Sequence, residues 1–312
     1  MSALAFALLA LLLVGPVPEL LARASWPMRA PRAAVVLWQA IAVAAVLSAF
    51  SAGIAIASRL LVPGPDGRPT ATFTSEIAVL GFPLWLAYIS VFALTLLIGA
   101  RFAVAVLQVA IATRRRRAHH RMLVDLLGEC REGGAAGTSH LRVLDVAEPL
   151  AYCLPGVRSR VVVSKGALNT LSDKEIHAIL RHERAHLRAR HDLVLEMFTA
   201  VHAAFPRVVR SAKALDAVRL LVEMLADDAA VRVAGPTPLA RALVACAAGP
   251  TPSGALAAGG LSTVVRVRRL GGRGNSLMVA TAAYLAAAAV LVVPTIALAI
   301  PWLTELHRLI AV

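Results

Sequence analysis

The sequence predicts an α-helical membrane protein with about four transmembrane helices and one α+β domain outside the bilayer. The chain is 59% hydrophobic with a mean hydropathy of +0.74, which is too apolar for a soluble protein of 312 residues. Four apolar runs are each long enough to cross the hydrocarbon core of a bilayer. Between the third and fourth runs lie about 160 residues of mixed composition, enough for a separate hydrophobic core.

The first three apolar runs form the predicted N-terminal membrane region, residues 1–113. The first span is placed at about 2–21 and is expected to stay in the membrane, because a signal peptide would begin with basic residues. The second span is predicted at 33–57 and the third at about 77–100. Arg101 suggests that the apolar residues after the third span leave the bilayer as an interfacial helix.

The fourth span is predicted at about 277–298, in a C-terminal region, residues 277–312, that ends in a short external tail after Trp302. Orientation follows from the arginine clusters, since cytoplasmic loops are rich in Arg and Lys. The clusters flank the first, third and fourth spans and comprise Arg23, Arg29, Arg32, Arg114, Arg115, Arg116, Arg117, Arg266, Arg268, Arg269 and Arg273. They predict a multi-pass protein of the cell (plasma) membrane with both termini outside and residues 114–276 in the cytoplasm.

A net charge of +14 is also found in proteins that bind nucleic acid. Here the arginines lie beside apolar runs and no nucleic-acid-binding motif accompanies them, so the predicted partner is the lipid bilayer, with no direct nucleic acid contact. Cys130, Cys153 and Cys246 are odd in number and widely spaced, which is typical of free thiols in a reducing compartment. Cys153 is interpreted as a packing residue rather than a nucleophile.

Residues 171–192 carry the clearest chemical pattern. A helix is predicted to begin at a capping box of Ser172 and Glu175, and no Gly or Pro interrupts it. It contains H-E-x-x-H at 182–186. Positions four apart share a helix face, so His182 and His186 can bind one metal ion, and Glu183 is placed to act as a general base for water. The alternative is a chance match on a solvated, arginine-rich helix.

A catalytic zinc site typically has three protein ligands, and two residues compete for the third place. His191 is one residue out of register with the longer metzincin pattern, and without a glycine to break the helix it is predicted to lie at the surface. Glu223 belongs to a second amphipathic helix that ends at Gly235-Pro236. Asp227, one turn later, can accept the second ring proton of a ligand histidine. The alternative for both carboxylates is an ordinary solvated acidic face.

Glu223-x-x-Ala226-Asp227 downstream of H-E-x-x-H resembles the gluzincin membrane peptidases. These include the HtpX and CAAX prenyl protease group and, closer in layout, the BlaR/MecR-type antibiotic-sensor metallopeptidases. The segments AYCLPG (151–156) and RVVVSKGAL (160–168) are similar to the family's substrate-side strand and the turn into its active-site helix. The resemblance covers about residues 149–229 and implies a Zn²⁺ cofactor, with His182, His186 and Glu223 as ligands and Glu183 as the catalytic base.

By this resemblance, residues 114–276 form a cytoplasmic α+β zincin-like zinc metalloprotease domain. An edge strand within 152–164 is expected to hold a peptide substrate by strand addition. The residue that stabilises the oxyanion stays unassigned, because nothing favours Arg219 or Arg232 on the helix of Glu223 over the other. The other expected elements are a helix at 122–127, strands at 141–146 and 161–164, a helix at 239–248, and linkers at 251–260 and 271–275.

The leading functional hypothesis is an integral-membrane zinc endopeptidase that cleaves a cytoplasmic protein, a BlaI-like transcriptional repressor. Relatives of this type carry a penicillin-sensing domain after the last span, whereas little follows Trp302 here, so direct β-lactam sensing is not expected. A second hypothesis is HtpX-like quality control, with damaged membrane proteins as substrates. A third is a non-catalytic membrane scaffold, which would bind no stoichiometric zinc.

Overall fold

The computed structural model describes residues 2–57, 60, 62–63, 69–70, 73–130, 141–156, 159–206, 211–247, 260–272 and 274–310. Within these ranges the chain is mostly helical, with one small sheet. Four helical stretches are long and apolar enough to cross a membrane, in agreement with the number predicted: Leu4–Arg23, Pro31–Ala57, Phe82–Leu127 and Leu277–Ala297.

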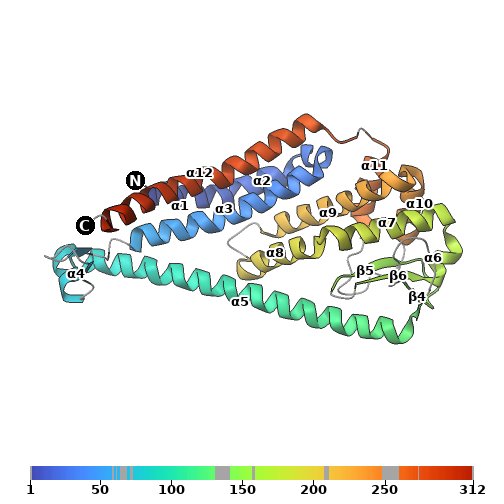
Figure 1. Cartoon of the computed structure of the whole chain (residues 1–312), viewed down its shortest axis with the longest axis horizontal. Helices are drawn as coiled ribbons and strands as arrows, with labels where there is room; N and C mark the ends of the chain where they lie inside the picture. The colour runs from blue at the N-terminus through green and yellow to red at the C-terminus, as the bar shows by residue number, and fades with distance from the viewer. Residues whose placement is uncertain are drawn as a thin grey trace.

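The first predicted span consists of two helices, α1 (Ser2–Val14) and α2 (Pro16–Arg23), which meet at Gly15. A short 3-10 helix, η1 (Trp26–Arg29), then leads into α3 (Pro31–Ala57). The second span therefore begins two residues before the predicted 33–57 and ends where expected. Helices α1 and α3 pack against each other, and α12 (Leu277–Ile310) packs on α3 (Figure 1).

The third span differs from the prediction at both ends. Residues 73–80 form a separate helix, α4 (Phe73–Leu80), preceded by the two-residue strands β1 (Val62–Pro63) and β2 (Pro69–Thr70). Gly81 has a φ of 76°, which favours glycine, and Pro83 lies in the first turn of the next helix. That helix, α5 (Phe82–Leu127), continues for 46 residues without becoming a separate interfacial helix. At about 69 Å it can cross a bilayer and extend well beyond it.

The end of α5 leads into the sheet. The sheet comprises β3 (Glu129–Cys130), β4 (Leu141–Leu144), β5 (Ala151–Leu154) and β6 (Arg160–Ser164), in the order β3-β4-β6-β5. β4 and β6 are parallel, whereas β5 runs antiparallel to β6. The strands predicted at 141–146 and 161–164 are therefore present. Within 152–164, where an edge strand was expected, β5 lies at an edge of the sheet and β6 lies in its interior.

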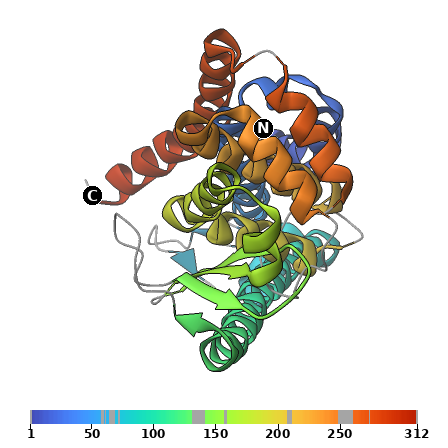
Figure 2. The same ribbon diagram turned by 90° about the vertical axis from the view of Figure 1, so that its right-hand side faces the viewer.

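The remaining helices cover one side of this sheet. They are α6 (Lys165–Thr170), α7 (Asp173–Ala189), α8 (His191–Ala204), α9 (Ser211–Ala234), α10 (Pro236–Cys246) and α11 (Gly260–Leu270). Figure 2 shows α7 between the sheet and the helices that follow it. The helix predicted at 239–248 corresponds to α10, whereas α11 was not predicted. The linker predicted at 251–260 lies, apart from Gly260, outside the described residues.

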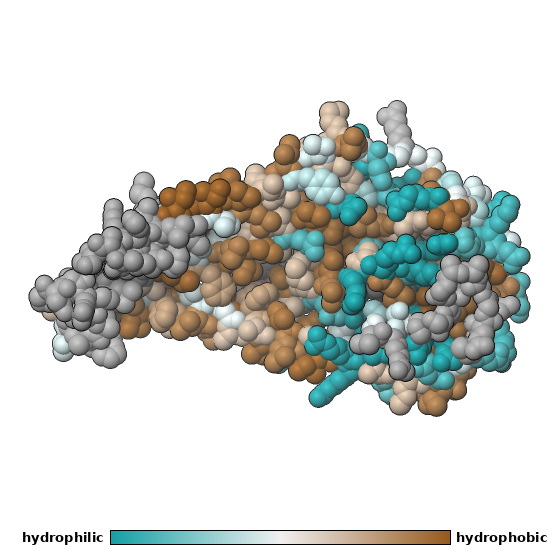
Figure 3. Space-filling view, in the orientation of Figure 1, coloured by the Kyte–Doolittle hydropathy of each residue, from teal (hydrophilic) through white to brown (hydrophobic). Residues whose placement is uncertain are grey.

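The C-terminal helix is longer than predicted. α12 passes Pro301, where an external tail was expected to begin, and continues to Ile310. A proline removes only one backbone hydrogen bond, and apolar helices of membrane proteins commonly contain one. Both chain termini lie at the end of the molecule far from the sheet (Figure 1). In Figure 3 hydrophobic residues dominate the middle part of the molecule, and hydrophilic residues gather at the opposite end, around the sheet and α7.

Candidate metal centre

Helix α7 presents the H-E-x-x-H residues as the sequence predicts. The Ser172 N–H donates a hydrogen bond of 2.9 Å to Glu175 Oε2, which is one half of the predicted capping box. His182, Glu183 and His186 are all buried on the face of α7 that meets α9 and the sheet. The chance alternative, a solvated helix, is excluded for these three side chains.

The end of α7 corrects the prediction for His191. Arg190 has left-handed backbone angles, φ 52° and ψ 41°, and ends the helix without a glycine. The chain turns there, and His191 begins α8 with only 5% of its surface exposed. His191 is therefore not a surface residue. The sequence offered no helix break because the left-handed residue is an arginine, which adopts this conformation only rarely.

Helix α9 brings Glu223 to the two histidines. Glu223 Oε2 lies 3.4 Å from His182 Nε2, and Glu223 Oε1 lies 3.5 Å from His186 Nε2. The Nε2 atoms of the two histidines are 3.1 Å apart. Among the described residues, these three form the one group of His, Cys, Asp or Glu side chains close enough to hold a metal ion.

These separations match what a zinc ion requires. Zinc bonds to nitrogen and oxygen are about 2.0–2.1 Å long, so two ligand atoms at the tetrahedral angle lie about 3.3–3.4 Å apart. Burial disfavours a charged carboxylate, but the His186 and His182 imidazoles and Arg266 hold the pKa of Glu223 well below its usual range. Glu223 is therefore ionised, as a metal ligand must be. The donor set and its spacing both fit the ion.

The outer ring nitrogen of each histidine also has a partner. His182 Nδ1 lies 3.0 Å from Asp227 Oδ1, and His186 Nδ1 lies 3.1 Å from His191 Nδ1. Burial, together with the nearby His186, lowers the pKa of His191 to about 4, so its ring is neutral and its Nδ1 can accept a hydrogen bond from the Nδ1–H of His186. Both partners direct Nε2 of the ligand histidines toward Glu223, which is the usual arrangement around metal-binding imidazoles.

Glu183 is buried beside this triad, with 3% of its surface exposed. Within the described residues, its Oε2 atom has no hydrogen-bond partner. Burial raises the pKa of Glu183, although the neighbouring His182 and His186 oppose the shift. The Cys153 thiol on β5 neighbours this carboxyl and is itself fully buried, with a raised pKa. Cys153 is therefore a packed, protonated thiol, in agreement with its interpretation from sequence.

Arg266 is the residue that the sequence analysis missed. It was assigned only to the basic flank of the fourth span, yet it is fully buried on α11. Its Nε and Nη2 atoms donate to Asp227 at 2.8 and 2.6 Å, and Nη1 lies 3.0 Å from Glu223 Oε2. The signal that could have revealed it is an arginine between valines at 264, 265 and 267, set apart from Arg268 and Arg269.

Neither arginine considered for the oxyanion lies in this cluster. Arg219 is exposed and pairs with Asp216 at 3.2 Å, and Arg232 lines a separate cavity. The carboxylates of Glu223 and Asp227 are not a solvated acidic face, because both lie in the buried cluster with Arg266.

One comparison with known proteins identifies the family. The family model described as BlaR1 peptidase M56 matches residues 31–205, which is more than half of the chain. The matched segment runs from α3 to the end of α8 and includes H-E-x-x-H, whereas Glu223 and Arg266 lie beyond it. No curated protein and no solved structure matches the chain. The family match covers two apolar spans and the helix that carries H-E-x-x-H, so the chain belongs to the BlaR1 peptidase M56 family of membrane metallopeptidases.

Proposed function

We propose that this chain is an integral-membrane zinc endopeptidase, with His182, His186 and Glu223 as the zinc ligands. The observation that carries the proposal is the convergence of two imidazoles from α7 and one carboxylate from α9 at separations of 3.1 to 3.5 Å. When bound, zinc supplies Lewis acidity, which lowers the pKa of a water molecule and polarises a peptide carbonyl.

Glu183 is the proposed proton carrier. Its unpartnered Oε2 atom is free to accept a proton from water, and its buried carboxyl can later give that proton to the departing amine. Burial raises the pKa of Glu183 toward neutral pH, which favours proton transfer both to and from its carboxylate. Asp227 and His191 position the ligand rings. Arg266 positions the two carboxylates, since it contacts Asp227 and Glu223 together.

Strand β5 is the proposed site of substrate binding. It lies at the edge of the sheet and packs against α7, and Cys153 on this strand neighbours Glu183. An extended peptide paired with the free edge of β5 would run alongside the active-site helix. Specificity for an extended, unfolded segment of the substrate follows from this arrangement.

The active site is proposed to face the cytoplasm. The arginine clusters at 23–32 and 114–117, together with Arg268 and Arg269, support this orientation, because the positive-inside rule places such clusters on the cytoplasmic side. Residues 114–276 then form the protease domain, although the boundary at 113 falls inside the single helix α5. A thiol-specific reagent that cannot cross membranes should label Arg115→Cys, in a cysteine-free background, only after permeabilisation. Labelling in intact cells would show instead that the domain faces the outside of the cell.

The proposed substrate is a BlaI-like transcriptional repressor, which a cytoplasmic site can reach. Full-length protein reconstituted with zinc should cleave the purified repressor, and Glu183→Gln should slow cleavage by about 100-fold or more while keeping one equivalent of zinc. If the same fraction of repressor stays uncleaved with both proteins, the repressor is not a substrate.

A comparison of protein termini in cells carrying wild-type or Glu183→Gln protein separates the remaining hypotheses. One cleaved regulatory protein supports signalling, whereas many cleaved membrane proteins support HtpX-like quality control. If no terminus differs and the purified protein holds no stoichiometric zinc, the chain is a scaffold and the peptidase proposal fails.

A further inference from the structure

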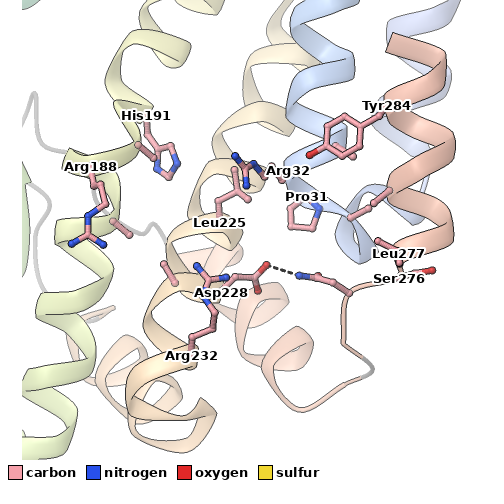
Figure 4. Close-up of a pocket in the computed structure, with 17 residues that line it drawn as sticks. Pro31, Arg32, Arg188, His191, Leu225, Asp228, Arg232, Ser276, Leu277 and Tyr284 are labelled. Atoms are coloured by element: carbon pink, nitrogen blue, oxygen red, sulfur yellow. Dashed lines mark hydrogen bonds between the residues drawn. The ribbon is translucent and has the colours of Figure 1, made fainter. Parts of the chain in front are cut away.

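A cavity of about 630 Å³ lies where the membrane helices meet the domain (Figure 4). Its walls come from the start of α3, the end of α7, His191 at the start of α8, the middle of α9 and the start of α12. Pro31 and Leu277 both line it, and each is the first residue of a candidate membrane span. The cavity therefore lies at the level where lipid head groups meet water.

Three arginines surround this cavity without carboxylate partners. Arg32, Arg188 and Arg232 come from α3, α7 and α9 and approach it from different sides (Figure 4). In the described part of the chain, no ion pair or hydrogen bond occupies any of their guanidinium groups. Asp228, the one carboxylate of the lining, is bound by Arg269 at 2.7 and 3.0 Å and by Asn275 at 3.0 Å. The cavity therefore carries uncompensated positive charge.

The wall on the membrane side is apolar. It includes Ala30 at the end of η1, Pro31 and Ala33 from α3, and Leu277 and Ala280 from α12. Tyr284, one turn further into α12, ends the lining and is 41% exposed. An aromatic residue with a hydroxyl group at this depth is typical of a membrane interface. A ligand that fits must therefore be anionic at one end and apolar at the other.

We propose that this cavity binds the phosphate head group of an anionic phospholipid. The phosphate contacts Arg32, Arg188 and Arg232, and the glycerol backbone and acyl chains extend past Leu277 and Tyr284 along α12. Basic pockets beside transmembrane helices are the general setting for such head groups, and guanidinium groups suit phosphate oxygens. The cavity shares one residue with the metal centre, because His191 both lines it and lies against His186, but the proposed lipid contacts do not depend on proteolytic activity.

The test measures lipid binding to the full-length protein in a neutral detergent by native mass spectrometry. The three probes are dioctanoyl-phosphatidylglycerol, dioctanoyl-phosphatidylcholine and inorganic phosphate. Wild-type protein should bind the phosphatidylglycerol most tightly. Loss of one arginine should weaken this binding about fivefold, and the Arg188→Gln/Arg232→Gln variant should weaken it about 30-fold. Arg188→Lys/Arg232→Lys keeps both charges and should retain most of the binding.

The matched control is Arg219→Gln/Arg268→Gln, which removes two exposed arginines from α9 and α11 that do not line the cavity. It should bind phosphatidylglycerol as wild type does. Equal binding by the control and the Arg188→Gln/Arg232→Gln variant would overturn the proposal. So would equal affinity for phosphatidylcholine, or binding of inorganic phosphate as tight as that of the lipid, which would indicate a soluble phosphate compound instead.

Discussion

The two sides of the metal centre belong to different cores. Helix α7 packs through Ala178 and Ile179 with Val163 of the sheet and Leu239 of α10, in the core of the aqueous domain. The first half of α9, up to Glu223, packs in a separate core with α3 of the membrane region; that core includes Val218, Val222, Trp38 and Ile41. The histidine pair is therefore placed by the domain, whereas the helix of the proposed third ligand packs on both α7 and the membrane helix α3. A complete site therefore requires the two cores to keep a fixed position relative to each other.

The largest expected effect comes from removing the ligand on the membrane side. Glu223→Ala leaves two imidazoles and no carboxylate, so zinc affinity should fall by more than about 100-fold, beyond the effect of losing a residue that only orients a ligand. Zinc content after dialysis, measured by mass spectrometry, checks this. Asp216→Ala on the same helix, where the carboxylate is exposed and pairs only with exposed Arg219, should keep a full equivalent. A full equivalent in Glu223→Ala would show that α9 supplies no ligand.

The same contrast explains how much the sequence could predict. The pattern of α7 is local: a capping box and H-E-x-x-H lie within one helix, so its start, face and residues follow from helical periodicity. Glu223 and Asp227 were proposed from the amphipathic pattern of their helix, and their spacing also has a counterpart in a known family. That they meet α7 depends on the tertiary packing of α9 on both α7 and α3, which no local pattern encodes. The four spans were predicted because apolar length is also a local property.

Arg266 shows the limit of local patterns. Charge alone places an arginine beside a membrane span, and only the tertiary fold shows that α11 turns this one toward Asp227 and Glu223. The neighbouring Arg269 on α11 instead binds Asp228, the Met28 carbonyl and Asn275, at the ends of the membrane helices. One short helix thus joins the carboxylate side of the metal centre to η1 and the start of α12.

Removing Arg266 should give the next largest effect. Arg266→Met leaves two buried carboxylates without their cation, and breaking a buried ion pair in this way costs about 3–5 kcal/mol. The free energy of unfolding of the metal-free protein in detergent should fall by about that amount. Arg268→Met, two residues along the same helix and exposed, should change it little.

The Arg266→Lys variant separates the effect of the positive charge from the effect of the two parallel contacts to Asp227. A lysine keeps the positive charge but cannot make the two parallel contacts to Asp227, so it should recover part of the lost stability and less of the zinc affinity. If Arg266→Met unfolds at the same denaturant concentration as wild type, the buried cluster does not hold the carboxylate side in place.

The smallest effect is expected on the domain side, at His191. His191→Phe removes the group that accepts the outer ring proton of His186, while the histidine itself and its helix stay in place. Zinc affinity should fall about tenfold, at the lower end of the range for residues that orient a ligand. His191→Asn, whose side-chain oxygen can accept the same proton, should restore part of it, and His177→Phe, at an exposed position of α7, should leave the affinity unchanged. Competition with a chromogenic zinc chelator measures all three. If His191→Phe and His177→Phe bind zinc equally well, the hydrogen bond from His186 to His191 does not contribute to zinc affinity. The domain then holds His186 by packing alone.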